Sequence, residues 1–402
     1  MENSLNGEAA EVIHRIGKPK TIWENGVYFT SQHLAGLAID PLTKRREVLR
    51  RPVFDPTCGA GDLLLRWADD LPVSTDLEAT IESWEPLLTG CELFPEFLRV
   101  ARRRLVLKAI ARGARLKGAR PLNVDKLFRG LRVGDARLQP NLDPLLTLVM
   151  NPPFSMVSSA DDCEWSSGKV SLAGVFFELL LKRASPKTPV VAILPDVLRT
   201  GTRYERWRSV ISARLRIARI QPYGRFDPHA DIDVFIIEGV VDSKTSNPVK
   251  WWQNAMEPTT RTISDLFNVS VGAVVPHRDP HIGDWSPIAT SKTIPAWKIV
   301  RKIETRRRFK GTKVEPPFVT VRRTSSPRDP ERAIGSLVIC QDPVAVENHL
   351  LVLKPQDGTS KTCEFILRNL KDARTKVWLD NRIRCRHLTV SALRALPIWE
   401  TV

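Results

Sequence analysis

The sequence predicts an α/β protein in which a doubly wound, mostly parallel sheet is followed by a separate, irregular and basic C-terminal domain. Between residues 52 and 241, short apolar runs end in an acidic residue or a proline, and helical patterns separate most of them. This alternation is typical of a doubly wound sheet. From about residue 242, tryptophans, prolines and cations replace it. At 402 residues, the chain is long enough for two domains. We therefore expect a leader over residues 1–20 and domains over residues 21–241 and 242–402.

The charge of the chain is strongly basic and unevenly distributed. The formal net charge is +16 and the isoelectric point is near 9.8. Residues 241–402 hold 27 Lys and Arg against 16 Asp and Glu, a net charge of +11. Such a surplus indicates a polyanionic partner, and nucleic acid is a better candidate than a membrane.

The cysteines and the N-terminal residues suggest where the protein resides. Six cysteines are scattered without close pairs or zinc spacing, so we expect reduced thiols and no metal site. The first residues include acidic side chains and lack the apolar core of a signal peptide. These features favour a cytoplasmic protein.

The first ordered element is expected after Gly26-Val27-Tyr28-Phe29-Thr30-Ser31. An apolar stretch follows, and either Thr30 or Ser31 can cap a helix that begins there.

Residues 52–65 predict a strand, a glycine loop and a helix. The strand ends at Asp55, the loop contains Gly59 and Gly61, and an apolar segment follows. Glycines allow a ligand to approach the backbone closely. The spacing is neither that of the dinucleotide fingerprint nor that of a phosphate-binding loop. An acid placed before such a loop suits a ligand with an ammonium group.

Two further strands are predicted to end in acids. Residues 87–92 end at Glu92, and residues 131–135 end at Asp135. An acid at the end of the second strand of such a sheet commonly accepts hydrogen bonds from ribose hydroxyls.

The fourth strand leads into Asn151-Pro152-Pro153-Phe154. Residues 145–150 are an apolar run, which predicts a buried strand. It ends here because a proline has no backbone N–H and has a fixed φ. The tetrapeptide offers an amide oxygen, a backbone carbonyl and an aromatic face at the edge where ligands bind in such sheets. Those groups suit a planar molecule with an exocyclic amine.

The remaining elements of the first domain are a helix over 172–184 and strands over 189–194, 217–220 and 234–239. Phe226 lies between the last two strands and is expected near the same edge of the sheet.

The motifs together resemble the gamma group of amino-methylating, S-adenosylmethionine-dependent DNA methyltransferases. The resemblance rests on GVYFTS, on DPTCGAG over residues 55–61, on the acids Glu92 and Asp135, and on NPPF, in this order. It implies a Rossmann-like methyltransferase fold over residues 21–241 and a target-recognition domain over 242–402. It also implies adenine-N6 methylation of duplex DNA in a restriction-modification or related defence system.

The resemblance implies a role for each motif residue. Asn151 and the Pro152 carbonyl would accept the two hydrogens of the target N6, so the catalytic residues would be Asn151, Pro152, Pro153 and Phe154. Phe154 and Phe226 would stack on the extruded base. S-Adenosylmethionine would be the cofactor, held by Thr30, Asp55, Cys58, Gly59, Gly61, Glu92 and Asp135. The basic C-terminal domain suggests as DNA-binding candidates Arg306, Arg307, Arg308, Arg322 and Arg323.

Two alternatives remain open at this point. Motifs of the NPPF type also occur in methyltransferases that act on RNA or on a protein glutamine. A non-catalytic specificity subunit could retain the fold, although the intact acids and Asn151 argue against it. The sequence contains no convincing nuclease motif, so a separate restriction endonuclease or specificity subunit is a candidate partner.

Overall fold

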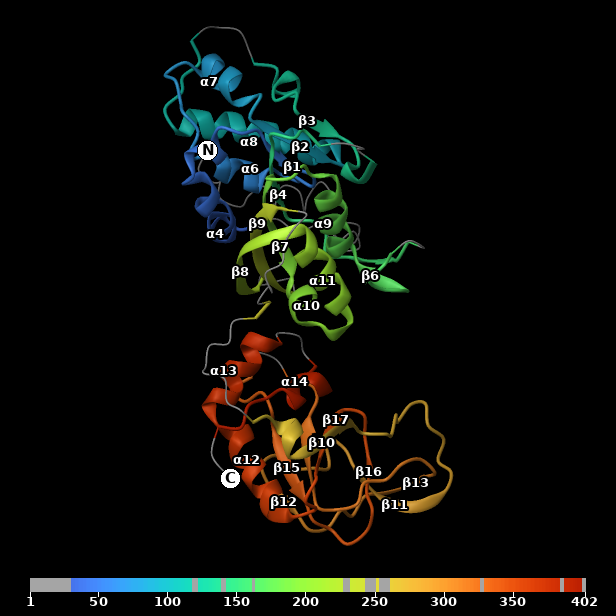
Figure 1. Cartoon of the computed structure of the whole chain (residues 1–402). Helices are drawn as coiled ribbons and strands as arrows, with labels where there is room; N and C mark the ends of the chain where they lie inside the picture. The colour runs from blue at the N-terminus through green and yellow to red at the C-terminus, as the bar shows by residue number, and fades with distance from the viewer. Residues whose placement is uncertain are drawn as a thin grey trace. The chain divides into compact units, whose positions relative to one another are not determined.

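The computed structural model describes residues 30–117, 122–138, 142–160, 163–226, 232–242, 251–252, 261–325, 329–383 and 387–399. The expected leader over residues 1–20 lies outside them. The chain divides into two compact units (Figure 1). The first comprises Met1–Arg199 and Arg203–Trp251, and the second comprises Thr200–Thr202 and Trp252–Val402. The separate functional roles expected of the two parts stay predictions.

The first unit is built on a seven-stranded sheet, in the order β3-β2-β1-β4-β7-β9-β8. Neighbours from β3 to β7 pair in parallel, and β9 runs antiparallel to both β7 and β8. This arrangement confirms the predicted doubly wound, mostly parallel sheet. The strands are β1 (Val53–Asp55), β2 (Leu88–Glu92), β3 (Leu131–Val133), β4 (Thr147–Met150), β7 (Pro189–Pro195), β8 (Leu215–Arg225) and β9 (Asp233–Val241).

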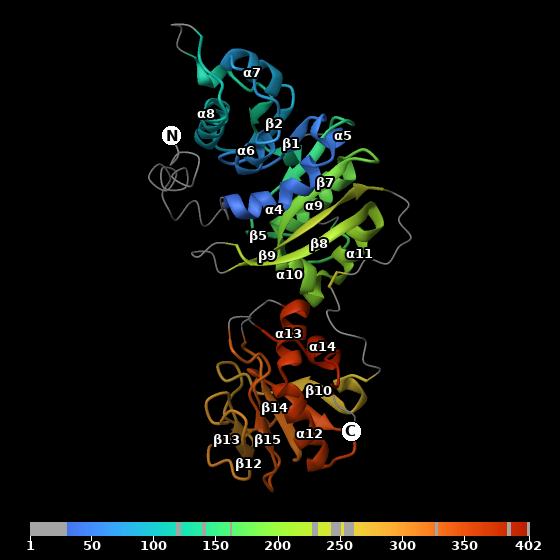
Figure 2. The same ribbon diagram turned by 90° about the vertical axis from the view of Figure 1, so that its left-hand side faces the viewer.

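Helices cover both faces of this sheet (Figures 1 and 2). Helices α4, α6 and α8 lie on one face, and α9 and α11 lie on the other. The helices are α4 (Gln32–Thr43), α5 (Arg46–Leu49), α6 (Asp62–Ala68), α7 (Leu77–Trp84), α8 (Pro95–Ala111), α9 (Leu172–Arg183), α10 (Asp196–Thr200) and α11 (Glu205–Arg214). Short 3-10 turns are η1 (Val124–Lys126), η2 (Ala136–Leu138) and η3 (Thr202–Tyr204), and β5 (Met156–Ser158) pairs with β6 (Lys169–Ser171) as a hairpin.

Three details differ from or sharpen the sequence prediction. Ser31, rather than Thr30, caps α4, because its side chain accepts the Leu34 backbone N–H at 3.3 Å. Strand β4 begins at Thr147, since Leu145 is 65% exposed in the preceding turn. In the described part of the connection from β3 to β4, the 3-10 turn η2 replaces the expected α-helix.

The centre of the sheet is the core of the first unit. Leu148, Val149 and Met150 of β4 are fully buried, as expected for a parallel strand covered on both faces. The end of β4 is therefore held firmly, and the residues that follow it are positioned by the core. None of the helices in the described segments is long and apolar enough to cross a membrane.

The second unit is more regular than the sequence predicts. It contains a five-stranded sheet, β10-β17-β14-β15-β12, and a three-stranded sheet, β13-β11-β16. Apolar runs such as Phe318–Arg322 and Leu350–Pro355 form its central strands, and the interspersed prolines and cations obscured this pattern. The elements are η4 (Ile263–Asp265), β10 (Phe267–Val271), β11 (Asp284–Ala289), β12 (Ile299–Val300), β13 (Arg306–Phe309), β14 (Phe318–Arg322), β15 (Gly335–Val338), β16 (Ala345–Val346), β17 (Leu350–Pro355), α12 (Ser360–Lys371), α13 (Ala373–Arg382) and α14 (Val390–Arg394).

Candidate functional site

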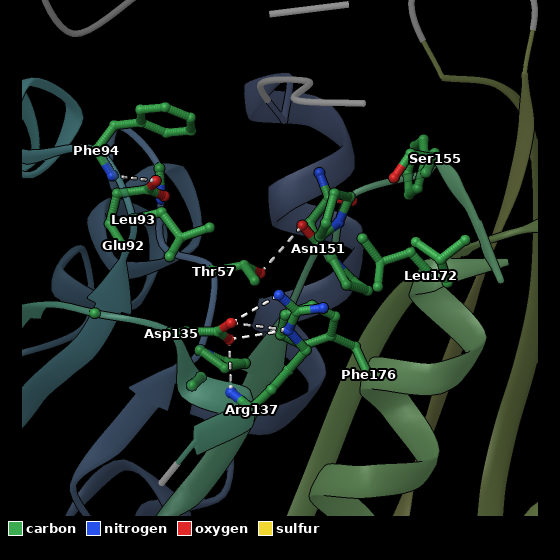
Figure 3. A pocket seen from close by; sticks show the side chains of 18 of the residues that line it. Thr57, Glu92, Leu93, Phe94, Asp135, Arg137, Asn151, Ser155, Leu172 and Phe176 are labelled. Atoms are coloured by element: carbon green, nitrogen blue, oxygen red, sulfur yellow. Dashed lines mark hydrogen bonds and ion pairs between the residues drawn. The ribbon is translucent and has the colours of Figure 1, made fainter. Parts of the chain in front are cut away.

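A cavity of about 400 Å³ lies where β1, β2, β3 and β4 end (Figure 3). The carboxyl ends of parallel strands meet at one edge of a sheet, and ligands bind there in open α/β proteins. Gly59 and Asp135, from the loops after β1 and β3, and Glu92, the last residue of β2, line the cavity. The tetrapeptide after β4 lines it as well. The structure thus brings together at one cavity residues from all four predicted motif segments that follow a strand.

Glu92 joins the loop after β1 to the loop after β2. Its carboxylate accepts the Gly59 backbone N–H at 2.9 Å and the Phe94 backbone N–H at 3.0 Å. Gly59 has φ of 52°, in the left-handed region that a residue without Cβ adopts readily. In this arrangement Glu92 shapes the glycine loop and still faces the cavity (Figure 3).

Gly61 and Cys58 are not among the residues that line the cavity. Gly61 has φ of 85°, and a Cβ placed on it would lie 3.1 Å from the Ala101 Cβ on α8. The reason for glycine here is therefore the turn and its packing on the helix. Cys58 is buried, its backbone N–H donates to the Cys91 carbonyl, and burial raises the pKa of its thiol well above the usual range.

Asp55, at the end of β1, is a buried carboxyl that does not line the cavity. Burial raises its pKa to about 8, although a hydrogen bond from the Thr57 backbone N–H at 3.0 Å favours the charged form. The nearby carboxylates of Glu92 and Asp62 raise the pKa further. Burial also raises the pKa of Glu92. A bound cation would lower both pKa values, so this edge of the sheet favours a positively charged ligand group.

Asp135 is paired with Arg137, a cavity residue that the sequence analysis did not select. The Arg137 guanidinium donates to both carboxylate oxygens, with Nη2 to Oδ2 at 2.7 Å and Nε to Oδ1 at 3.0 Å. These bonds hold the pKa of Asp135 below its ordinary value. The guanidinium also lies 5.5 Å from the Phe176 ring, which projects from α9 (Figure 3). Asp135 is therefore ionised and fixed in direction at the cavity wall.

The side-chain amide of Asn151 is held at its nitrogen end. Its Nδ2 donates to the Thr30 hydroxyl at 3.0 Å, and the Thr30 backbone N–H donates to Asp62 Oδ2 at 3.0 Å. Asp62 in turn accepts from Arg104 on α8 at 2.7 Å. The Asn151 Oδ1 atom is buried and accepts no hydrogen bond from the described residues. An unsatisfied buried acceptor is costly, and Asn151 lines the cavity, so a donor on a ligand in the cavity is the partner that would satisfy this oxygen.

The backbone of the tetrapeptide is also tied to the glycine loop. The Thr57 hydroxyl donates to the Asn151 carbonyl at 3.3 Å (Figure 3). Sequence reasoning missed Thr57, Asp62 and Arg104, because each acts through a partner distant in sequence. Thr30 was selected, and the structure places its hydroxyl on Asn151 instead of at the cavity wall.

The two candidate stacking rings, Phe154 and Phe226, contact each other. Their centroids are 5.3 Å apart and the rings are perpendicular. Phe154 lines the cavity, whereas Phe226 is not among its lining residues. The edge-to-face packing leaves no gap for a base between the two rings.

The arginines expected to bind DNA lie in the second unit. Arg306 and Arg308 are exposed, whereas Arg307 is buried and Arg322 and Arg323 are half-buried. Arg307 donates to the Asp279 carbonyl, and Arg323 donates to the Asn348 carbonyl at 3.3 Å. Among the residues that the structure describes, no group of three His, Cys, Asp or Glu side chains could hold a metal ion.

No protein-family model matches the sequence, and no curated protein matches it. Solved structures do resemble it. MmeI, a type IIL restriction-modification enzyme solved in complex with DNA, matches 96% of this chain and 66% of its own length, with 11% identity and a TM-score of 0.53. The M protein of the type I restriction enzyme EcoKI matches 53% of this chain and 44% of its own length, with 17% identity and a TM-score of 0.38.

A Listeria monocytogenes protein described as a class I S-adenosylmethionine-dependent methyltransferase matches 61% of this chain and 71% of its own length, with 13% identity and a TM-score of 0.37. The likeness to MmeI, together with the strand order, shows the fold. The first unit has a Rossmann-like methyltransferase fold. The chain spans less than half of the length of the EcoKI M protein, and about two thirds of MmeI.

Burial of Asp55 predicts that the stability of the protein depends on pH. Its folded pKa is about 8 against an ordinary value of 3.8. Between these values the unfolded chain loses the proton that the folded chain keeps, so the free energy of unfolding falls as pH rises. Asp55→Asn keeps the acceptor for Thr57 and cannot titrate. The free energy of unfolding in urea is measured for both proteins across this pH range. The difference between the variant and the wild type should rise by up to about 1.4 kcal/mol per pH unit. A difference that is constant with pH would contradict this interpretation of the buried carboxyl.

Proposed function

We propose that the chain is a DNA methyltransferase that transfers a methyl group from S-adenosylmethionine to the N6 amine of an adenine extruded from duplex DNA. One observation carries this proposal. The Asn151 amide is fixed by Thr30 at its nitrogen, and its oxygen is a buried acceptor without a donor. An exocyclic amine of a planar base supplies the donor that this oxygen lacks.

The cavity residues fit the proposed cofactor. The cavity has a volume of about 400 Å³, which is within the range of small-molecule sites. Glu92 would accept hydrogen bonds from the ribose hydroxyls, and Asp135, held by Arg137, would accept one from the adenine amine of the cofactor. The loop at Cys58, Gly59 and Gly61 would hold the amino acid part of the cofactor. The Asp55 carboxyl would attract the ammonium group of that part. When bound, the cofactor supplies an electrophilic methyl group on a sulfonium.

The residues after β4 would make the target amine reactive. An aromatic amine is a weak nucleophile because its lone pair is delocalised into the ring. Asn151 Oδ1 and the Pro152 carbonyl would accept its two hydrogens and favour a tetrahedral nitrogen with a free lone pair. Pro153 keeps the backbone of this segment rigid. Fixed acceptors of this kind act by positioning and by electrostatic stabilisation of the transition state.

The target adenine must leave the duplex to reach these groups. Extrusion costs a few kcal/mol, and stacking on Phe154 would offset part of that cost. Phe226 supports this ring, since the two side chains pack edge to face. Its proposed role is therefore to hold Phe154 in place.

The second unit is proposed to recognise the DNA target. The region that contains it is the more basic part of the chain, with a net charge of +11 over residues 241–402. MmeI, which matches nearly the whole chain, is a restriction-modification enzyme solved in complex with DNA. We therefore place the activity in a restriction-modification or related defence system, with a separate restriction endonuclease or specificity subunit as a candidate partner.

Replacing Asn151 tests the proposed contact to the amine. Asn151→Ala removes one fixed acceptor and should lower methyl transfer to adenine in duplex DNA by about 100-fold or more, with cofactor affinity unchanged within a few-fold. Asn151→Asp should be milder, because a carboxylate still accepts hydrogen bonds, including one that the Thr30 hydroxyl can donate. Single-turnover rates and calorimetric titration with the cofactor measure the two quantities. If Asn151→Ala keeps full activity, this segment has only a structural role and the proposed contact is wrong.

Replacing Thr30 tests whether the orientation of Asn151 matters. Thr30→Val keeps the shape and the backbone N–H to Asp62 but removes the acceptor for Asn151 Nδ2. We expect kcat to fall by about fivefold, the value of one hydrogen bond of roughly 1 kcal/mol, with little change in KM for DNA. Thr30→Ser keeps the hydroxyl and should retain the rate. If Thr30→Val weakens only cofactor binding, Thr30 contacts the cofactor and does not position Asn151.

A further inference from the structure

Strands β11 and β13 of the second unit form an antiparallel ribbon with two unlike faces. The register pairs Trp285 with Arg308 and Pro287 with Arg306. Side chains alternate along a strand, so Arg306 and Arg308 share one face while Arg307 and Phe309 share the other. Arg307 and Phe309 are 6% and 7% exposed, which shows that their face is the inner one.

The outer face extends one step beyond the end of β13. Lys310 continues the alternation of Arg306 and Arg308 and is exposed. Gly283, which precedes β11, lies close to it: a Cβ on Gly283 would lie 2.9 Å from the Lys310 Cα. Arg306 and Arg308 therefore lie about 6.8 Å apart along the strand, and Lys310 is the next cation at the same two-residue interval.

Trp285 lies on the same face, directly across from Arg308, and is 63% exposed. The arginines beside it are braced by the backbone. Arg306 Nη2 donates to the Trp285 carbonyl at 3.4 Å, and Arg308 Nε donates to the Gly283 carbonyl at 2.9 Å. One acidic group, Asp342, pairs with Arg306 at 3.4 Å in an exposed position. Such a pair is weak in water, so it leaves Arg306 free to exchange its partner.

The ribbon lies on the side of the second unit away from α12 and α13 (Figures 1 and 2). A single exposed aromatic side chain would need no explanation. A tryptophan beside two braced arginines, with an exposed lysine next in line, is a different pattern. Aligned cations bind phosphates, and an indole offers a flat surface to bases and sugars. A two-stranded ribbon is also narrow enough to enter the major groove of DNA.

We propose that the outer face of this ribbon, formed by Trp285, Arg306, Arg308 and Lys310, is a contact surface for double-stranded DNA. The three cations bind phosphates, and Trp285 packs against base edges and deoxyribose. The inference rests on the proposed function for its choice of DNA, and it identifies one surface of the second unit that carries the contact. Arg307 has a structural role on the inner face, where it donates to the Asp279 carbonyl.

The test separates the two kinds of contact by their salt dependence. The full chain is titrated onto a fluorescently labelled DNA duplex at several salt concentrations. Replacing Arg306, Arg308 and Lys310 with Ala should weaken binding. It should also flatten the slope of log K against log salt by roughly 0.9 for each phosphate that no longer meets a cation, up to about 2.7 in all. Trp285→Ala should weaken binding about fivefold or more at every salt concentration, with the slope unchanged, because its contact is not ionic.

A matched control removes charge elsewhere in the same unit. Lys361 and Arg368 are exposed cations of α12, and replacing both with Ala should leave the slope within error of the wild type. The paired change of Arg306 and Arg308 removes the same charge and is the direct comparison. Equal slopes for the two paired variants would overturn the proposal, since the effect would then be one of overall charge. So would wild-type affinity in Trp285→Ala, or tighter binding of an RNA hairpin than of the duplex.

The outcome is distinguishable from a failure of the proposed function. Binding is measured without cofactor and does not require methyl transfer. If the ribbon variants lose duplex affinity but the wild type methylates no DNA, the ribbon proposal holds and the activity is wrong. If the wild type methylates duplex DNA and the ribbon variants bind it normally, the activity holds and this surface is wrong.

Discussion

The proposed site depends on the hydrogen bond between the Thr30 hydroxyl and the side-chain amide of Asn151. The Thr30 hydroxyl accepts a hydrogen bond from the amide nitrogen of Asn151 at 3.0 Å. Thr30 is held in turn, because its backbone N–H donates to Asp62, which also accepts from Arg104. The amide oxygen is left buried and without a donor among the described residues. The proposed chemistry depends on this orientation, because an amide turned the other way would present a donor to an amine that needs an acceptor.

The carboxyl groups near this amide are largely buried, and their burial destabilises the fold. Asp62 and Glu92 lie close to Asp55, and burial raises the pKa of Asp55 and Glu92. The buried strand β4 and the packing of Gly61 on α8 hold the loops in place despite this repulsion. Perturbed carboxyls that converge on a cavity are typical of functional sites. Here they make the edge of the sheet receptive to a cationic ligand group.

Much of the first unit follows from local patterns in the sequence. Apolar runs that end in Asp55, Glu92 and Asp135 predict parallel strands, and the ends of such strands must meet at one edge. The partners of these residues could not be predicted, because they depend on tertiary contacts. Arg137 and Thr57 are ordinary residues in the sequence, and only their contacts with Asp135 and Asn151 distinguish them. The same holds for the arginines of the second unit. Three consecutive arginines look equivalent until the register of β13 places Arg307 inside and its neighbours outside, and a shift of one residue would exchange those faces.

The central claim concerns the atom that receives the methyl group. The direct measurement is to incubate the purified chain with S-adenosylmethionine carrying a tritiated methyl group and unmethylated bacterial genomic DNA, and then to digest the DNA and separate the nucleosides. The account predicts that the label elutes with N6-methyldeoxyadenosine, and that ribosomal RNA and protein in parallel reactions stay unlabelled. Label found in RNA or protein but not in DNA, or in a methylated cytosine, would contradict it.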